Sequence, residues 1–127
     1  MANFIWASKK PLDDIATIYE ANITLNKSAS SYFESAYVVL LGLDREHCQI
    51  AVKPVTKEEV SLGFIPEEQQ HNITVKSSYS RICNKQFVQE AAALSGLEFG
   101  DSQFYKFKAV WNPKDNALII DLKHREG

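Results

Sequence analysis

Apolar and polar residues alternate strictly near the end of the chain, in the segment QFYKFKAVW at positions 103–111. Side chains alternate between the two faces of a β-strand, so this pattern predicts a strand with one buried face. The segment NPKDN at 112–116 is a dense turn signal, and the apolar segment ALIIDL at 117–122 is typical of a buried strand. We therefore expect a β-hairpin, with Lys106 and Lys108 on the exposed face of its first strand.

Helical spacing of apolar residues predicts one short helix in each half of the chain. In the first half, Ser31 and Glu34 fit a capping box, and Gly42 can close the helix in a left-handed conformation. In the second half, Asn84 and Gly96 have the corresponding capping roles. The apolar positions that would share one face are Phe33, Ala36, Tyr37 and Leu40 in the first helix, and Phe87, Ala91 and Leu94 in the second.

The order of these elements suggests an internal duplication. The β-branched stretch NITL at 22–25 returns as NITV at 72–75, and each is followed by a predicted helix, a Gly-Leu pair and more strand. Landmark residues correspond if the second copy carries a four-residue insertion between strand and helix. We expect a single domain over 1–127, with a first repeat at about 21–55, a charged connector at about 56–70 that holds one short helical turn, and a second repeat at about 71–122.

Composition and charge are those of an ordinary globular protein. The chain has 127 residues, of which 45% are hydrophobic and 24% charged. No apolar run approaches the roughly 18 residues that a membrane span requires, and the N-terminal region has none long enough for a signal peptide, so we expect a cytoplasmic protein. The net charge of −2 argues against indiscriminate binding of polyanions but allows a local basic face.

The sequence predicts neither a metal site nor an active site. Cys48 and Cys83 are too few and too far apart for a metal pattern, and we expect reduced, mostly buried thiols. The three histidines are scattered, without further ligands at metal-binding spacing. The carboxylate pairs at 13–14, 58–59 and 67–68 lie in surface-like segments, and neither a phosphate-binding glycine loop nor a catalytic triad pattern is present. We therefore expect a protein without cofactors that is not an enzyme.

The second half of the chain resembles the swapped-hairpin family that includes the AbrB, MazE, SpoVT and MraZ proteins. Positions 80–85 (SRICNK) are similar to the arginine-containing loop of that family, 95–101 (SGLEFGD) to its Gly-Asp turn, and 103–122 to its hairpin. Two copies in one chain are similar to MraZ. The resemblance implies an α+β fold in which two strand–helix–hairpin repeats form a small β-barrel with short helices. Asn84 stands where the family usually has proline, and neither copy has the Asp-x-x-x-Arg motif of MraZ at the corresponding loop.

What the resemblance implies about function is a cytoplasmic transcriptional regulator that binds double-stranded DNA, in a homo-oligomer. Carried over by position, Arg81 matches the family's arginine loop, and Lys85 lies just past it. Lys76 at the end of NITV, and Lys27 near the corresponding place in the first copy, extend the same predicted surface. Arginine would contact phosphate oxygens in pairs, and lysine would act as a point charge.

Two alternatives accompany this interpretation. The four cations are also what an ordinary solvated strand edge carries, where lysine discourages edge pairing. The rival function is a protein-interaction or assembly module that has the same fold and binds no DNA. Tyr32, Tyr79 and Trp6 are candidates for stacking on bases, although aromatic residues at strand and helix starts more often pack in a core.

Overall fold

The computed structural model describes residue 3, residues 13–100 and residues 103–126 of the chain. Trp6 and Asp101, which the sequence proposed for base stacking and for the Gly-Asp turn, lie outside these described residues. Within them, no helix is long and apolar enough to cross a membrane.

Eight strands and a few short helices make up the fold, so the α+β class is confirmed. The strands are β1 (Ile15–Tyr19), β2 (Asn22–Asn26), β3 (Val38–Asp44), β4 (Gln49–Val55), β5 (Thr74–Val75), β6 (Tyr79–Cys83), β7 (Phe104–Asn112) and β8 (Ala117–Glu126). The α-helices are α1 (Lys27–Ser30), α2 (Lys57–Ser61) and α3 (Lys85–Ser95), and two 3₁₀ turns cover Ser31–Phe33 and Glu67–Gln69.

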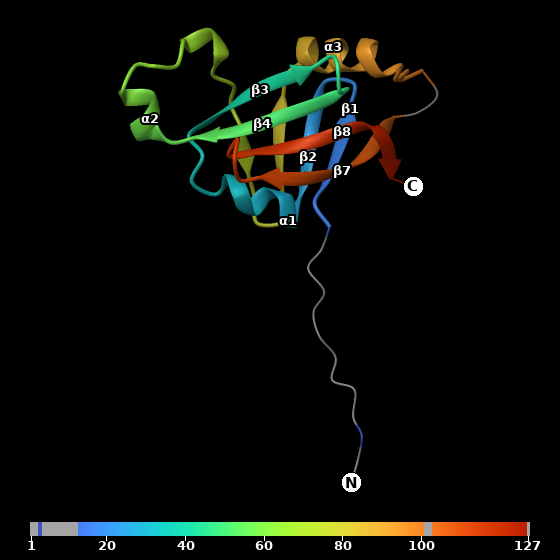
Figure 1. Cartoon of the computed structure of the whole chain (residues 1–127), viewed down its shortest axis with the longest axis horizontal. Coiled ribbons are helices and arrows are strands. Elements are labelled where there is room, and N and C mark those ends of the chain that lie inside the picture. Colours follow the sequence, from blue (N-terminus) through green and yellow to red (C-terminus); the bar gives the residue numbers. More distant parts are fainter. Residues whose placement is uncertain (1–2, 4–12, 101–102, 127) are drawn as a thin grey trace.

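The strands form one curled antiparallel sheet in the order β3-β4-β8-β7-β1-β2-β6-β5. Its two ends meet at a single bridge, where Val39 of β3 and His71, just before β5, exchange backbone hydrogen bonds of 2.8 and 3.0 Å. Strands β3, β4 and β8 cross over β1, β2 and β6, so the sheet is a half-barrel rather than a flat layer (Figure 1). The concave side encloses the core.

The burial of side chains along β7 confirms the alternation that the sequence predicts for the first strand of the hairpin. Phe107 and Ala109 of β7 are buried, whereas Lys106 and Lys108 between them are exposed. The predicted hairpin is also present, since Asn112 pairs with Ala117 and Trp111 with Leu118. The largest fully buried side chains come from six strands of the sheet and from the 3₁₀ turn at Ser31–Phe33: Phe33, Phe107, Ile18, Ile23, Leu25, Ile50, Ile82, Leu118 and Ile120.

Helix α3 has the boundaries that its capping residues predict. The backbone N–H of Phe87 donates to Oδ1 of Asn84 at 3.0 Å, which satisfies one of the free amides of the first turn. Gly96 closes the helix in the left-handed region, with φ of 74°. Phe87, Val88 and Ala91 form the buried face of the helix.

Replacing Asn84 with alanine is expected to lower the free energy of unfolding by about 1 kcal/mol, because the amide of Phe87 loses its capping acceptor. Urea denaturation monitored by circular dichroism measures the change. The control is Gln86→Ala in the same first turn, on an exposed side chain, which is expected to stay within about 0.5 kcal/mol of the parent. Equal effects of the two substitutions would contradict the capping role.

The prediction of a helix between Ser31 and Gly42 is wrong. Residues from Val38 onward form strand β3, and Gly42 lies inside it, opposite Ala51 of β4. Helix α1 precedes this region and is capped by Asn26, whose Oδ1 accepts from the N–H of Ala29 at 3.0 Å. The four apolar residues do have helical spacing, but the β-branched pair at 38–39 favours a strand, and pairing with β4 satisfies its backbone.

The stretches NITL and NITV are both in strands but in different positions of the sheet. NITL forms most of β2, a central strand, whereas only Thr74 and Val75 of NITV form the edge strand β5. The two strands flank β6 on opposite sides. The connector contains the short helical turn expected of it, as α2 with a complete capping box at Thr56 and Glu59.

Candidate nucleic-acid interface

The outward positions of five adjacent strands, β7, β1, β2, β6 and β5, form one surface that we call the outer face. Ala16, Ile18, Ile23, Leu25 and Ile82 point into the core and are at most 1% exposed. Because side chains alternate along each strand, the residues between them point away from the core. The outer face is therefore fixed by the same packing that buries the apolar side.

One row of side chains crosses all five strands. Lys106 lies opposite Thr17, Thr17 opposite Thr24, Thr24 opposite Arg81, and Arg81 opposite Thr74. Neighbouring strands are about 4.8 Å apart, so the backbones at Lys106 and Arg81 are separated by about 14 Å. Hydroxyl groups of two threonines fill the space between these cations.

A second row adds two lysines. Lys108 lies opposite Ile15, and at the other side of the outer face the backbone N–H of Lys76 donates to the carbonyl of Tyr79 at 2.8 Å. Lys76, Arg81, Lys106 and Lys108 are all exposed. None of the described outward positions on these five strands carries a carboxylate. Among the described residues, Asp13 and Glu20 lie near the two ends of β1, and Glu126 of the adjacent strand β8 lies opposite Lys106 in the strand register.

Aromatic rings lie between the cations. Tyr19, Asn22, Thr24, Tyr79 and Arg81 line a shallow hollow of about 390 Å³. The guanidinium of Arg81 lies 5.4 Å from the centroid of the Tyr79 ring. At the other side, Lys106 is 5.8 Å from the ring of Phe104, which lies 5.7 Å from that of Tyr19. Cations, hydroxyls, an amide and exposed rings are the groups that contact the phosphates, sugars and bases of nucleic acids.

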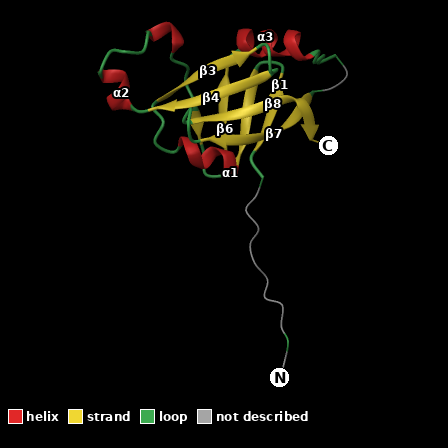
Figure 2. Cartoon of the chain, in the orientation of Figure 1, coloured by secondary structure: helices red, strands yellow, loops and turns green. Residues whose placement is uncertain are grey.

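The structure brings together two of the four cations proposed from the sequence. Arg81 and Lys76 share the outer face on the neighbouring strands β6 and β5. Lys27 and Lys85 each follow a helix N-cap, at the ends of β2 and β6. Those strands are antiparallel, so the two lysines lie at opposite ends of the sheet, as α1 and α3 do (Figure 2). Sequence reasoning identified Lys106 and Lys108 as exposed but not as part of this surface.

The cysteines differ from the expectation of two buried thiols. Cys48 is half-buried and packs against the core, but Cys83 is exposed at an outward position of β6. Cys83 lies opposite Asn22, next to the aromatic hollow. The alternation of β6 accounts for this, because Ile82 occupies the inward position beside it.

Displaced pKa values are found outside the outer face. The backbone N–H of His47 donates to Asp44 at 3.0 Å, and this bond holds the pKa of that carboxyl below its ordinary value. The N–H of Lys123 lowers the pKa of Asp121 in the same way. Burial, with a contribution from Asp14, raises the pKa of Tyr32. These shifts are caused by turn and packing contacts, so they do not mark a catalytic group.

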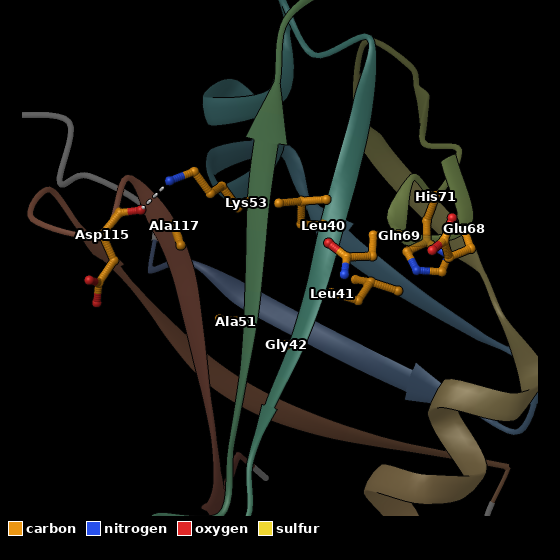
Figure 3. Close-up of a pocket in the computed structure, with 10 residues that line it drawn as sticks. All are labelled: Leu40, Leu41, Gly42, Ala51, Lys53, Glu68, Gln69, His71, Asp115 and Ala117. Carbon is orange, nitrogen blue, oxygen red and sulfur yellow. Dashed lines mark hydrogen bonds between the residues drawn. The ribbon is translucent and has the colours of Figure 1, made fainter. Parts of the chain in front are cut away.

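A second hollow, of about 530 Å³, lies over β3, β4 and the beginning of β8 (Figure 3). Its floor is formed by small residues, since Gly42 faces Ala51 and an added Cβ there would lie 3.7 Å from the Cβ of Ala51. On one side, Nζ of Lys53 donates to the carbonyl of Asp115 at 3.2 Å, and Glu68 lies on the other side. The rim carries both signs of charge, so the hollow does not select an anion or a cation.

Comparison of the chain with protein-family models, with curated proteins and with solved structures finds no match. The arguments on function therefore rest on the geometry of the outer face and on the strand registers.

Proposed function

We propose that this protein is an AbrB- and MraZ-like transcriptional regulator that binds double-stranded DNA through the outer face. The observation that carries the proposal is the pair of cationic groups, Arg81 with Lys76 and Lys106 with Lys108, on one strand surface whose described outward positions hold no carboxylate. A local surface of this kind binds phosphates even though the whole chain has a net charge of −2.

The strand registers support a repeat, with a correspondence other than that between NITL and NITV. Thr17 lies opposite Thr24 in the first hairpin, and Thr74 lies opposite Arg81 in the second. The same displacement along the chain carries Thr17 to Thr74 and Thr24 to Arg81. By this correspondence the hairpin β1–β2 matches β5–β6. Thr24 and Arg81 are then equivalent residues, and they face each other across the β2–β6 pair.

The two remaining hairpins, β3–β4 and β7–β8, correspond equally well. Each turn begins with an Asp or Asn whose side chain accepts from backbone amides, and each ends with a left-handed residue, Cys48 with φ of 54° and Asn116 with φ of 50°. The displacement between these turns also carries Ala51 to Ile119, which face each other across the β4–β8 pair. The two proposed copies are thus β1–β4 and β5–β8, related by a local twofold axis.

An exchange of hairpins between the copies supports the swapped-hairpin arrangement. Strand β7 of the second copy pairs with β1 of the first. In the other direction, β3 of the first copy bridges to His71, directly before β5 of the second. The hairpin β7–β8 thus pairs with the first strand of the opposite copy, and the hairpin β3–β4 makes one bridge next to β5, as expected for swapped hairpins.

Replacing Arg81 with alanine is expected to weaken binding to duplex DNA and to reduce the slope of log K against log salt by about 1, because one phosphate contact is lost. Fluorescence anisotropy with a labelled duplex, at a series of salt concentrations, measures both quantities. Lys114→Ala is the matched control, because Lys114 is an exposed cation in the turn at 113–116, away from the outer face.

Three results would contradict the proposal. The parent protein would fail to bind random or upstream duplexes at low salt, or Lys114→Ala would reduce the slope as much as Arg81→Ala does. The third is binding of a single strand in preference to the duplex, which would assign the aromatic hollow to unpaired bases instead.

A protein-interaction module is the second candidate, favoured by one observation. Leu62 and Phe64 in the connector are 66% and 82% exposed, and large apolar side chains that project together are typical of contact surfaces. Absence of DNA binding at low salt together with a stable protein complex would support this candidate over the first.

A further inference from the structure

The connector between β4 and β5 is an ordered segment that projects from the sheet. Both of its ends are held by backbone hydrogen bonds, from Tyr37 to Val55 at 2.8 Å and between Val39 and His71. The capping box of α2 begins it, and Gly63 turns the chain after α2 with φ of 77°. Figure 1 shows this segment extending away from the sheet. Its tip therefore holds Leu62 and Phe64 away from the core.

The charge of the connector is opposite to that of the outer face. Around the exposed tip it carries the carboxylates of Glu58, Glu59, Glu67 and Glu68, all exposed, and a single cation, Lys57. The outer face carries Lys76, Arg81, Lys106 and Lys108. Both surfaces also expose aromatic rings, Phe64 on the connector and Tyr19 with Phe104 on the outer face.

We infer that the connector of one copy of this chain docks on the outer face of a second copy. Phe64 enters the hollow beside Tyr19 and the stacked Arg81–Tyr79 pair, where an aromatic ring meets both an apolar surface and a guanidinium. The glutamates on either side of the tip face the lysines around the hollow. Apolar contact supplies affinity, and the opposite charges fix which surfaces meet.

Charge distinguishes the outer face from the other hollow as the acceptor. The hollow over β3 and β4 carries Lys53 as well as Glu68 and Asp115 on its rim, so it does not select an acidic connector, whereas the described outward positions of the outer face carry cations and no carboxylate. The connector also does not use the outer face of its own chain, since Phe64 is 82% exposed in the single copy. The occupant is therefore a second copy.

The contact has a regulatory consequence that rests on the proposed function. DNA and the connector would use the same cations, so self-association at low DNA concentration would cover the DNA-binding surface. Duplex DNA in excess would release the copies. The self-association itself does not depend on that function.

Sedimentation equilibrium of the full chain, over a range of protein and salt concentrations, tests the contact. The average mass is expected to rise with protein concentration and to fall with added salt, because exposed charge pairs are screened. Phe64→Ser and Arg81→Glu are each expected to raise the dissociation constant at least about 10-fold, which is about 1.4 kcal/mol. Lys114→Glu, the charge-matched control, is expected to leave it unchanged.

Complementation makes the test specific. The double variant Glu67→Lys/Glu68→Lys has an altered connector and an intact outer face, and Arg81→Glu has the reverse. Each alone is expected to associate weakly, and their mixture is expected to recover association, because one intact connector meets one intact face. Circular dichroism of each variant verifies that it is folded.

The inference is overturned if the parent is monomeric at all concentrations, or if Phe64→Ser and Arg81→Glu leave the dissociation constant unchanged. It is also overturned if only Leu40→Asp, in the hollow over β3 and β4, abolishes association. Adding a duplex separates the two proposals: association without DNA binding contradicts the proposed function alone, and DNA binding by a strict monomer contradicts the contact alone.

Discussion

Replacing Phe107 with alanine is expected to lower the free energy of unfolding by about 3–5 kcal/mol, the largest effect of the single substitutions considered for stability. Phe107 is fully buried and lies in β7, which pairs with β1 on one side and β8 on the other. Removing the ring loses its transfer from water and leaves a cavity that three strands line. Total stability of a domain is about 5–15 kcal/mol, so a measurable unfolded fraction is expected.

Urea denaturation followed by tryptophan fluorescence measures this change. Lys108→Ala is the matched control, because it removes the very next side chain on the same strand, from an exposed position. That variant is expected to stay within about 0.5 kcal/mol of the parent. A loss of less than about 1 kcal/mol for Phe107→Ala would show that the ring is not at the centre of the core.

Replacing Ser30 with alanine is expected to lower the free energy of unfolding by about 1–3 kcal/mol. The hydroxyl oxygens of Ser30 and Ser80 are 2.7 Å apart, and both residues are buried. Among the described residues, Ser30 is the one hydrogen-bond partner recorded for the Ser80 side chain. The substitution therefore leaves a polar group without a partner inside the core.

The double variant Ser30→Ala/Ser80→Ala is expected to recover most of the loss, because neither polar group then remains buried. Free energies of unfolding for the parent, both single variants and the double variant complete a double-mutant cycle. Additive losses would show that the two hydroxyls act independently and would contradict the pairing.

The sequence correctly predicts those elements whose conformation is determined by signals within their own residues. The hairpin β7–β8 and helix α3 are of this kind, because strict alternation and the caps at Asn84 and Gly96 are local signals. Strand β3 is different. Its residues have helical spacing, and their conformation is decided by pairing with β4, which a local pattern does not encode.

The candidate site shows the same difference between what local sequence determines and what strand pairing determines. Arg81 and Lys76 are close in sequence, and they lie on neighbouring strands of the outer face. Lys106 joins them through a row that passes over β1 and β2, so its place depends on three strand registers. Lys27 and Lys85 each follow a strand of the outer face but lie at opposite ends of the sheet, because β2 and β6 are antiparallel. Register, rather than residue type, assembles this surface.

The pairing of β1 with β7 has a consequence for synthesis of the chain. Strand β1 ends at Tyr19, and its partner begins at Phe104. The ribosome must therefore release the chain through β7 before β1 has its second neighbour, and until then the hairpin of β1 and β2 exposes an unpaired edge at β1. Pairings over such separations are slow to form and leave edges open to other chains. Folding of this half-barrel is completed only after β7 has left the ribosome, and the nascent chain is vulnerable to aggregation until then.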